Sequence, residues 1–387
     1  MKTIFWTSFL ILFYSYGGYL LFSMIFIMFK KHKPKSIFKQ NPENLPSVSL
    51  IIAAYNEEST IQEKIDNCFN LIYPKKLLEI IFITDGSTDS TPEKIKRYSE
   101  LRLLHQIQRS GKPAAINRAV PFAKHEILVF CDANTFLNPE SILFMVNHYE
   151  DPKVGGVSGE KKIRLTEGSV ASGGEGIYWK YESLLKKMDS KLYSVIGAAG
   201  ELFSVRRALF EFINPNTIID DFVISLKINL KGYRIIYEPK AFAEEYASSS
   251  ISEERKRKYR ISAGAFQAMG LLPQLWNFTK YPLLTFLYFS HRVLRWTLCP
   301  IALFCLLFCN FFIWNSSFYG TTLIVQIIFY LLALVGFLSS NQKNIHKIFY
   351  VPFYFLFMNY AVIKGFILFL TGQQSSIWEK SNRIQNP

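Results

Sequence analysis

The sequence predicts an α/β domain with a mostly parallel sheet, joined to about four transmembrane helices. Half of the 387 residues are hydrophobic, although the net charge is +14. All but one of the 30 acidic residues lie between Glu43 and Glu254, whereas both flanks are apolar or basic. Within the acidic region, short apolar runs alternate with amphipathic helical patterns. This composition excludes a disordered chain, a collagen and a small disulfide scaffold.

The acidic region opens with a run of β-branched and apolar residues at 48–54, which predicts a buried strand. Residues 57–71 follow it and place Ile61, Ile65 and Cys68 on one helical face. The alternation of strands and helices indicates a mostly parallel sheet with helices on both faces. Further strands are expected at 79–84, 102–106 and 126–131, and further helices from Thr91, over 113–122 and from Asn138.

The N-terminal apolar run, residues 4–29, has no charge and ends at a basic cluster, residues 30–35. A bilayer core needs roughly 20 apolar residues of helix. Because the run is too long for a signal-peptide core and lacks a small-residue cleavage site, we expect a retained anchor over residues 1–30. Three further runs predict C-terminal membrane helices within residues 291–372, at 296–314, 321–338 and 348–370.

The charges in the loops between these runs set the expected orientation. The loop at residues 315–320 has no charge, whereas the loop at residues 339–347 carries Lys343 and Lys347. The positive-inside rule places this loop and residues 30–35 on the cytoplasmic side. Both termini then lie outside, and residues 45–254 form the cytoplasmic domain of a multi-pass protein in the cell membrane.

Residues 255–290 connect the acidic region to the last three apolar runs. Five basic residues lie within residues 255–260, and an apolar stretch follows that is broken by Pro273 and Pro282. A basic cluster beside apolar surface can bind nucleic acid or anionic lipid. Because this cluster adjoins a membrane run, we expect lipid headgroups of the inner leaflet rather than nucleic acid, and an amphipathic helix at the membrane surface.

Polar residues follow three of the predicted strands, at 55–57, 85–87 and 132–134. In open parallel sheets, ligands bind at the carboxyl ends of the strands. The sequence has no G-x-G-x-x-G after the first strand, no complete P-loop and no nucleophile elbow. The histidines and the five cysteines have no metal-ligand spacing. The remaining chemistry is a carboxylate that holds a divalent cation against a nucleotide diphosphate.

Six segments resemble the signatures of family 2 glycosyltransferases. One such match would be weak, but six in family order over about residues 48–264 are specific. The membrane runs resemble those of the cellulose, chitin and hyaluronan synthase-like branch. The segments at 48–58, 85–89 and 111–117 resemble the first three signatures of the family. The segments at 132–134, 219–221 and 257–261 resemble its D-x-D, T-E-D and Q-x-x-R-W motifs.

The resemblance implies a GT-A fold, a nucleotide-sugar donor and inversion at the anomeric carbon. It implies Mg²⁺ or Mn²⁺, held by Asp132 and Asn134, which would absorb charge on the diphosphate leaving group. Asp221 would be the base that takes the proton of the acceptor hydroxyl. The resemblance also implies donor-binding roles for Tyr55, Glu57, Asp85, Lys112 and Asp132, with Asp85 at the nucleobase, and acceptor-side roles for Gly200, Asp220, Arg257 and Arg260.

The chain departs from the family pattern at three motifs. Arg257 and Ile261 replace the Gln and Trp that help to hold the acceptor sugar in processive synthases. We therefore expect transfer of one or a few sugars to a lipid-linked or glycan acceptor, in cell-surface polysaccharide or glycolipid synthesis. The alternatives are a processive polysaccharide synthase, for which a partner membrane subunit or a second copy could complete a channel, and a catalytically inactive scaffold. The other two departures are Asn134 for the second acid of D-x-D and Asp220 for the Glu of T-E-D.

Overall fold

The protein is described by a computed structural model, which covers residues 1–30, 45–164, 172–246, 250–340 and 345–373. Its centre is an eight-stranded sheet with the order β3-β2-β1-β4-β7-β6-β8-β5. Within this sheet β1, β2, β3 and β4 are mutually parallel, as are β6 and β8. The strands are β1 Val48–Ala54, β2 Leu78–Asp85, β3 Arg102–Gln106, β4 Ile127–Asp132, β5 Thr135–Leu137, β6 Val154–Arg164, β7 Leu202–Arg206 and β8 Arg234–Tyr246.

The predicted α/β class with a mostly parallel sheet is confirmed. The four strands expected from the sequence are β1 to β4, and their bounds agree with the expected ones to within a residue. The second half of the sheet is mixed, because β7 runs antiparallel to both β4 and β6, and β5 runs antiparallel to β8. Strands β5 to β8 are not predicted by the sequence patterns, and β6 contains three glycines and several charged residues.

Side chains of each parallel strand alternate between two hydrophobic cores, one on each face of the sheet. Ile51 belongs to one core, and Leu50 and Ile52 belong to the other. Helices α5 Lys112–Ala119, α7 Ser172–Leu192 and α8 Asp220–Leu230 cover the face of Ile51, whereas α3 Ile61–Phe69, α4 Thr91–Lys96 and α6 Ser141–Val146 cover the opposite face.

Among the residues that the structure describes, three helices are long and apolar enough to cross a membrane, or four if one bent pair counts as a single span. The expected anchor is a stretch of 28 residues, Lys2–Phe29, and the third and fourth runs are α13 Ser317–Leu338 and α14 Lys347–Leu370. The expected run at 296–314 is instead part of the bent pair, Pro282–Trp296 and Leu298–Ile313, with a bend of 52°. Basic residues 31–35 and Lys343, on which the expected orientation rests, lie outside the described residues.

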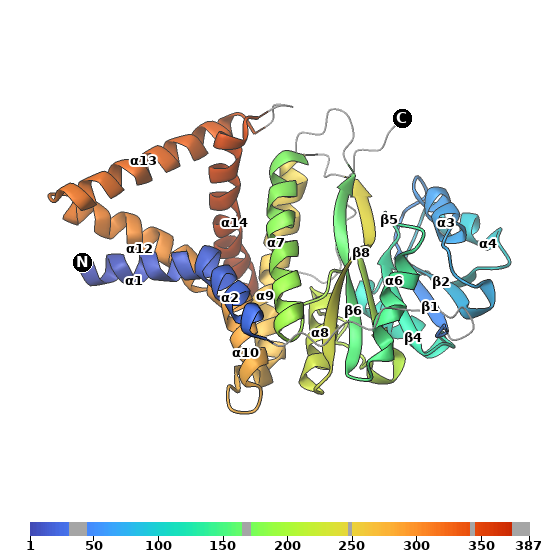
Figure 1. The fold of residues 1–387 in the computed structure, drawn as a ribbon. Helices are drawn as coiled ribbons and strands as arrows, with labels where there is room; N and C mark the ends of the chain where they lie inside the picture. Colours follow the sequence, from blue (N-terminus) through green and yellow to red (C-terminus); the bar gives the residue numbers. More distant parts are fainter. Residues whose placement is uncertain (31–44, 165–171, 247–249, 341–344, 374–387) are drawn as a thin grey trace.

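The anchor contains α1 Lys2–Phe13, the π-helix η1 Tyr14–Gly18 and α2 Tyr19–Phe29, and the bent pair contains α10 Pro282–Tyr288, the π-helix η8 Phe289–Val293, α11 Leu294–Trp296 and α12 Leu298–Ile313. Figure 1 shows these apolar helices on one side of the molecule and the sheet on the other, with α7 between them. The ammonium of Lys30, directly after the anchor, donates to the carbonyls of Lys191 and Leu192 at 2.8 and 2.6 Å. A cation at these free carbonyls stabilises the C-terminal end of α7.

The expected membrane-surface helix is α9 Ile251–Leu271, which packs along α14. Ser250 caps its N-terminus by accepting a hydrogen bond from the Glu253 N–H. The expected contact of the basic cluster with lipid headgroups stays a prediction. Arg255 and Lys256 are exposed, whereas the other three cations are half-buried or buried and line, together with Lys256, a cavity described below. These three cations are Arg257, Lys258 and Arg260.

The contact between α9 and α14 requires a glycine at position 365. A Cβ atom on Gly365 would lie 2.3 Å from Cβ of Ser262 and 2.7 Å from the backbone nitrogen of Ala263. Gly365→Ala should therefore destabilise the protein by about 1–3 kcal/mol, because the two helices must separate. Thermal unfolding of purified protein measures the effect. Gly270→Ala on α9 is the control, since a Cβ there meets nothing within 4 Å; an equal loss of stability in both variants would contradict this view.

Candidate active site

Two loops at the carboxyl ends of β1 and β2 are joined by hydrogen bonds. Asn56 has a positive φ of 53°, and its backbone N–H donates to the hydroxyl of Ser87 at 3.1 Å. The Asn56 side chain accepts from the N–H of Thr88 at 2.8 Å. The Glu57 N–H donates to the hydroxyl of Thr91 at 2.9 Å, and α3 begins at Ile61, later than the sequence predicts. These contacts fix Tyr55 and Glu57 at the sheet edge.

Asp85 supports the turn that precedes Lys112. Its carboxylate accepts hydrogen bonds from the backbone N–H groups of Ser110 and Gly111, at 3.0 and 2.7 Å. The side chain is 6% exposed and is not among the residues that line the cavity described below. In this structure Asp85 therefore orients the turn, and its predicted contact with a nucleobase stays a prediction.

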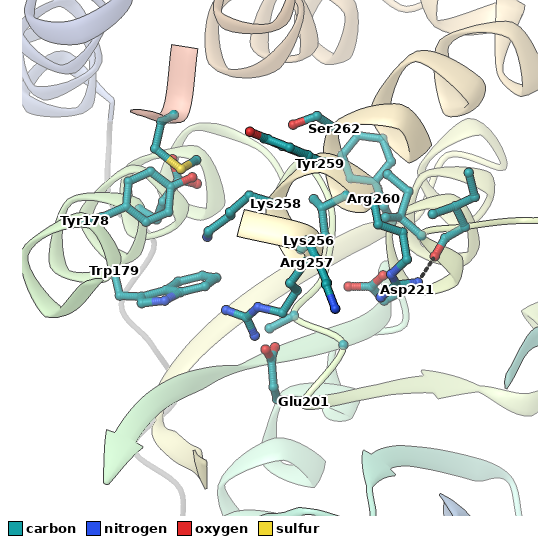
Figure 2. A pocket seen from close by; sticks show the side chains of 18 of the residues that line it. Tyr178, Trp179, Glu201, Asp221, Lys256, Arg257, Lys258, Tyr259, Arg260 and Ser262 are labelled. Atoms are coloured by element: carbon teal, nitrogen blue, oxygen red, sulfur yellow. Dashed lines mark hydrogen bonds between the residues drawn. The ribbon is translucent and has the colours of Figure 1, made fainter. Parts of the chain in front are cut away.

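A cavity of about 910 Å³ brings the other predicted site residues together. It extends from the carboxyl ends of β1 and β4 to α9 and α14. Figure 2 shows that Glu201, Asp221 and Arg257 converge in this cavity from different elements. Of the residues predicted from the sequence, those that line it are Tyr55, Glu57, Lys112, Asp132, Asn134, Gly200, Asp220, Asp221, Arg257 and Arg260.

Lys112 and Asp132 form an ion pair in the part of the cavity beside the end of β4, with Nζ and Oδ1 2.5 Å apart. Burial alone would lower the pKa of Lys112, but the carboxylates of Asp132 and Asp220 outweigh burial and raise it. Lys112 is thus held as a cation beside the end of β4. A diphosphate that enters this end meets a preorganised positive charge.

Asp221 lies at the N-terminus of α8, where the helix dipole favours an acidic side chain. Burial and the neighbouring Asp220 carboxylate raise the pKa of Asp221 to about 7, although Lys112 opposes this change. A carboxylate whose pKa is near neutrality is suited to accept a proton at physiological pH. Arg260 lies close by and donates to the carbonyl of Ile218 at 3.4 Å (Figure 2).

A linked group of charged and aromatic residues at the cavity was not identified from the sequence. Lys161 on β6 pairs with Glu201 at 2.6 Å and with Glu245 on β8. Burial would raise the pKa of Glu201, but Lys161 outweighs burial and lowers it, so Glu201 is ionised. The ammonium of Lys161 also lies 5.0 Å from the ring centre of Trp179. The sequence offered one signal for this group, which is a charged residue inside each of the strands β6 and β8.

The family comparison agrees with this geometry. Residues 49–213 match the family described as Glycosyl transferase family 2. This stretch of the chain is therefore similar to family 2 glycosyltransferases. The enzyme class expected from the sequence is confirmed, as is the resemblance to the branch of membrane-bound polysaccharide synthases.

Curated relatives include two poly-beta-1,6-N-acetyl-D-glucosamine synthases. The glycosyltransferase is 28% identical to that of Staphylococcus aureus (strain COL) over 239 residues, which cover 59% of this chain and 57% of the relative. It is also 28% identical to that of Staphylococcus epidermidis over 275 residues, which cover 68% of this chain and 65% of the relative. The chain thus spans less than two thirds of the length of the curated relatives that it matches.

A solved structure shares the fold. It is the mannosyltransferase PcManGT from Pyrobaculum calidifontis in complex with GDP-Man and Mn²⁺, with a TM-score of 0.71 and 22% identity over 96% of this chain and 99% of that chain. The likeness confirms the GT-A-like sheet and supports the arrangement of helices around it.

The residues at the end of β4 fit a divalent cation of the expected kind. Asp132 supplies carboxylate oxygens, and Asn134, on the cavity wall, can supply an amide oxygen. Across the described part of the chain, no group of three or more His, Cys, Asp or Glu residues could by itself hold a metal. This agrees with Mg²⁺ chemistry, in which one or two carboxylates act together with substrate phosphates.

Gly200 leaves the space that Asp221 occupies. A Cβ atom at position 200 would lie 3.1 Å from Oδ2 and 3.2 Å from Cγ of Asp221. Gly200→Ala should therefore displace the carboxylate by a few tenths of an ångström and lower sugar transfer by roughly 10-fold or more. Initial rates with purified enzyme measure this. Gly176→Ala, where a Cβ meets nothing within 4 Å, is the control; wild-type rates in both variants would exclude a close steric constraint on Asp221.

Proposed function

We propose that this glycosyltransferase moves a sugar from a nucleotide-sugar to a hydroxyl of a lipid-linked or glycan acceptor, with inversion, in the synthesis of a cell-surface polysaccharide or glycolipid. One observation carries the proposal: a single cavity contains the Lys112–Asp132 pair at one end and Asp221 further along, and reaches the apolar helix α14. Donor and acceptor can therefore meet at Asp221 from opposite ends. The poly-N-acetylglucosamine synthases among the relatives support a polysaccharide product.

At the donor end, Asp132 and Asn134 would hold Mg²⁺ or Mn²⁺. When bound, the cation would neutralise charge on the diphosphate as the glycosidic bond to it breaks. Lys112 adds a second positive charge on the same side, positioned by the turn that Asp85 orients. The nucleoside would lie against the loop of Tyr55 and Glu57, which the hydrogen bonds to the following loop hold in place.

At the acceptor end, Asp221 would take the proton of the attacking hydroxyl, because an alcohol is a poor nucleophile without a base. A single base suffices for one displacement with inversion. Gly200 keeps the carboxylate accessible, and Asp220 raises its basicity. Arg257 and Arg260 from α9 reach the same space and would hydrogen-bond to hydroxyls of the acceptor.

A processive polysaccharide synthase is the second candidate. The absence of a tryptophan at position 261 favours a short product, but Trp179 lines the same cavity from α7. An aromatic side chain at this wall can support a sugar ring, so the expected platform has a substitute from another element. The names of the curated relatives favour the same candidate. We place the catalytic domain on the cytoplasmic side of the cell membrane, where nucleotide-sugars are available.

Asp221→Asn should reduce sugar transfer by roughly 10²–10⁴-fold, as expected for loss of a general base. Binding of the donor should change little, because the carboxylate acts on the acceptor. Transfer from a labelled nucleotide-sugar measures the first effect, and donor titration with Mg²⁺ or Mn²⁺ measures the second. The size of the wild-type product distinguishes a short glycan from a polymer. Wild-type turnover in the variant would refute the role of Asp221, and metal-independent wild-type transfer would refute the role of the cation.

The pH dependence of kcat/KM should reflect the pKa of Asp221 and its coupling to Asp220. Because the base works only when deprotonated, kcat/KM should rise with pH through about 7, the pKa of Asp221, and then level off. Asp220→Asn removes the neighbouring negative charge, so the acidic limb should move to lower pH by roughly one unit. Asp66→Asn, at an exposed position of α3, is the control and should leave the profile unchanged. An unchanged profile in Asp220→Asn would mean that another group sets the limb.

A further inference from the structure

The membrane-side half of the cavity has a different chemistry from the donor end. Its wall is formed by α7, the π-helices η1 and η8, and α11, and it is lined by three basic residues and the carboxylate of Glu182. Tyr16 and Tyr181 are also part of this wall. The charged residues are Lys186, Arg292, Arg295 and Glu182. We refer to these four charged residues as the cationic end.

Lys186 is the central observation. Its side chain lines the cavity but is only 5% exposed, and it makes no hydrogen bond or ion pair with any residue that the structure describes. Its ammonium lies 5.9 Å from the ring centre of Trp179. Burial lowers the pKa of Lys186, and Arg292 acts in the same direction against Glu160. A buried cation without a partner is unfavourable unless a ligand supplies the negative charge.

Arg295 leaves donor capacity unused as well. Both pair with the same carboxylate, since Arg292 lies 2.9 Å from Glu182 and Arg295 contacts its other oxygen. Nη1 of Arg295 is buried and has no hydrogen-bond partner among the described residues. Asp189, the next acid on α7, is engaged elsewhere, because it accepts from Tyr19 and contacts His291. Glu182 is therefore shared by two arginines, whereas Glu160 and Glu201 act on Lys186 electrostatically without forming an ion pair with it.

We propose that the cationic end binds the phosphate or diphosphate of a lipid-linked acceptor. The proposal rests on the proposed function and specifies its acceptor. Such a group satisfies the ammonium of Lys186 and the guanidinium of Arg295 by charge-assisted hydrogen bonds. The apolar chain of the lipid would lie along α14, which adjoins the cationic end. One face of this helix lines the same cavity with apolar side chains. They are Val351, Phe355, Met358 and Val362.

This arrangement separates the two anionic groups of the reaction. The diphosphate of the donor has Lys112 and the cation site at the strand ends, whereas the acceptor phosphate has Lys186 and the arginines near the apolar helices. The sugar of the acceptor then reaches from the cationic end toward Asp221. A neutral acceptor would leave Lys186 buried without a counter-charge.

The test measures binding to the full-length protein in phosphatidylcholine nanodiscs. The probes are farnesyl phosphate, farnesol and inorganic phosphate. Farnesyl phosphate should bind at least about tenfold more tightly than either of the others, because only it offers both the charge and the apolar chain. Lys186→Met should remove this preference, and Lys186→Arg should retain most of it. Lys187→Met, at the exposed neighbouring position on α7, is the matched control and should bind like wild type.

The melting temperature separates a ligand-binding role from a structural one. Lys186→Met removes an unpaired buried charge, so its melting temperature should equal or exceed that of the wild type. A lower melting temperature, farnesol binding as tight as that of farnesyl phosphate, or an unchanged preference in Lys186→Met would each overturn the proposal. Inorganic phosphate binding as tightly as farnesyl phosphate would overturn the lipid-linked source.

Nucleotide-sugar hydrolysis, followed in the same wild-type samples, keeps the two proposals apart. Selective binding of farnesyl phosphate without any metal-dependent hydrolysis would contradict the proposed function and support the subsite. Hydrolysis without selective binding would support the function and contradict the subsite.

Discussion

The position of the catalytic domain relative to the apolar helices depends on buried charges of one helix, α7. Glu182 on this helix pairs with Arg292 and Arg295, and Asp189 pairs with His291 and with Tyr19 of the anchor. Loss of one partner from such a buried pair leaves an uncompensated charge, which is strongly destabilising. The network therefore fixes the N-terminal anchor and the bent helix pair against the domain. It also forms one wall of the cavity, so the shape of the site follows from it.

The opposite constraint operates at the strand ends, where like charges are brought together. Asp132, Asp220 and Asp221 all line the cavity, and their mutual repulsion is relieved by Lys112, Arg260 and the N-terminus of α8. Asp220 and Asp221 can therefore begin a helix and also take part in the proposed acid–base chemistry. The dipole of the helix keeps two adjacent acids tolerable, and their burial makes one of them basic near neutral pH.

Much of the fold could be predicted because local sequence patterns determine it. The apolar runs of β1 to β4, and the polar residues that follow them, need only neighbouring residues to be recognised. The strands β6 and β8 could not be recognised in the same way, because Lys161 and Glu245 are charged residues whose burial depends on a partner in the other strand. The direction of Arg257 and Lys258 could not be predicted either, because it depends on residues of other elements, such as Glu245 on β8 and Trp179 on α7.

The structure explains how an arginine is accommodated at position 257, where the family motif has a glutamine. An arginine at the position of a neutral glutamine would add an uncompensated charge, but Arg257 lies 3.6 Å from Glu245 and 3.2 Å from Glu254. Glu245 is shared with Lys161, which in turn holds Glu201 and approaches Trp179. The substitution is therefore part of a linked set of residues on β6, β8, α7 and α9. Under the proposed function, this set would form part of the acceptor wall, and the length of the product would then depend on how the set holds a sugar and not on position 261 alone.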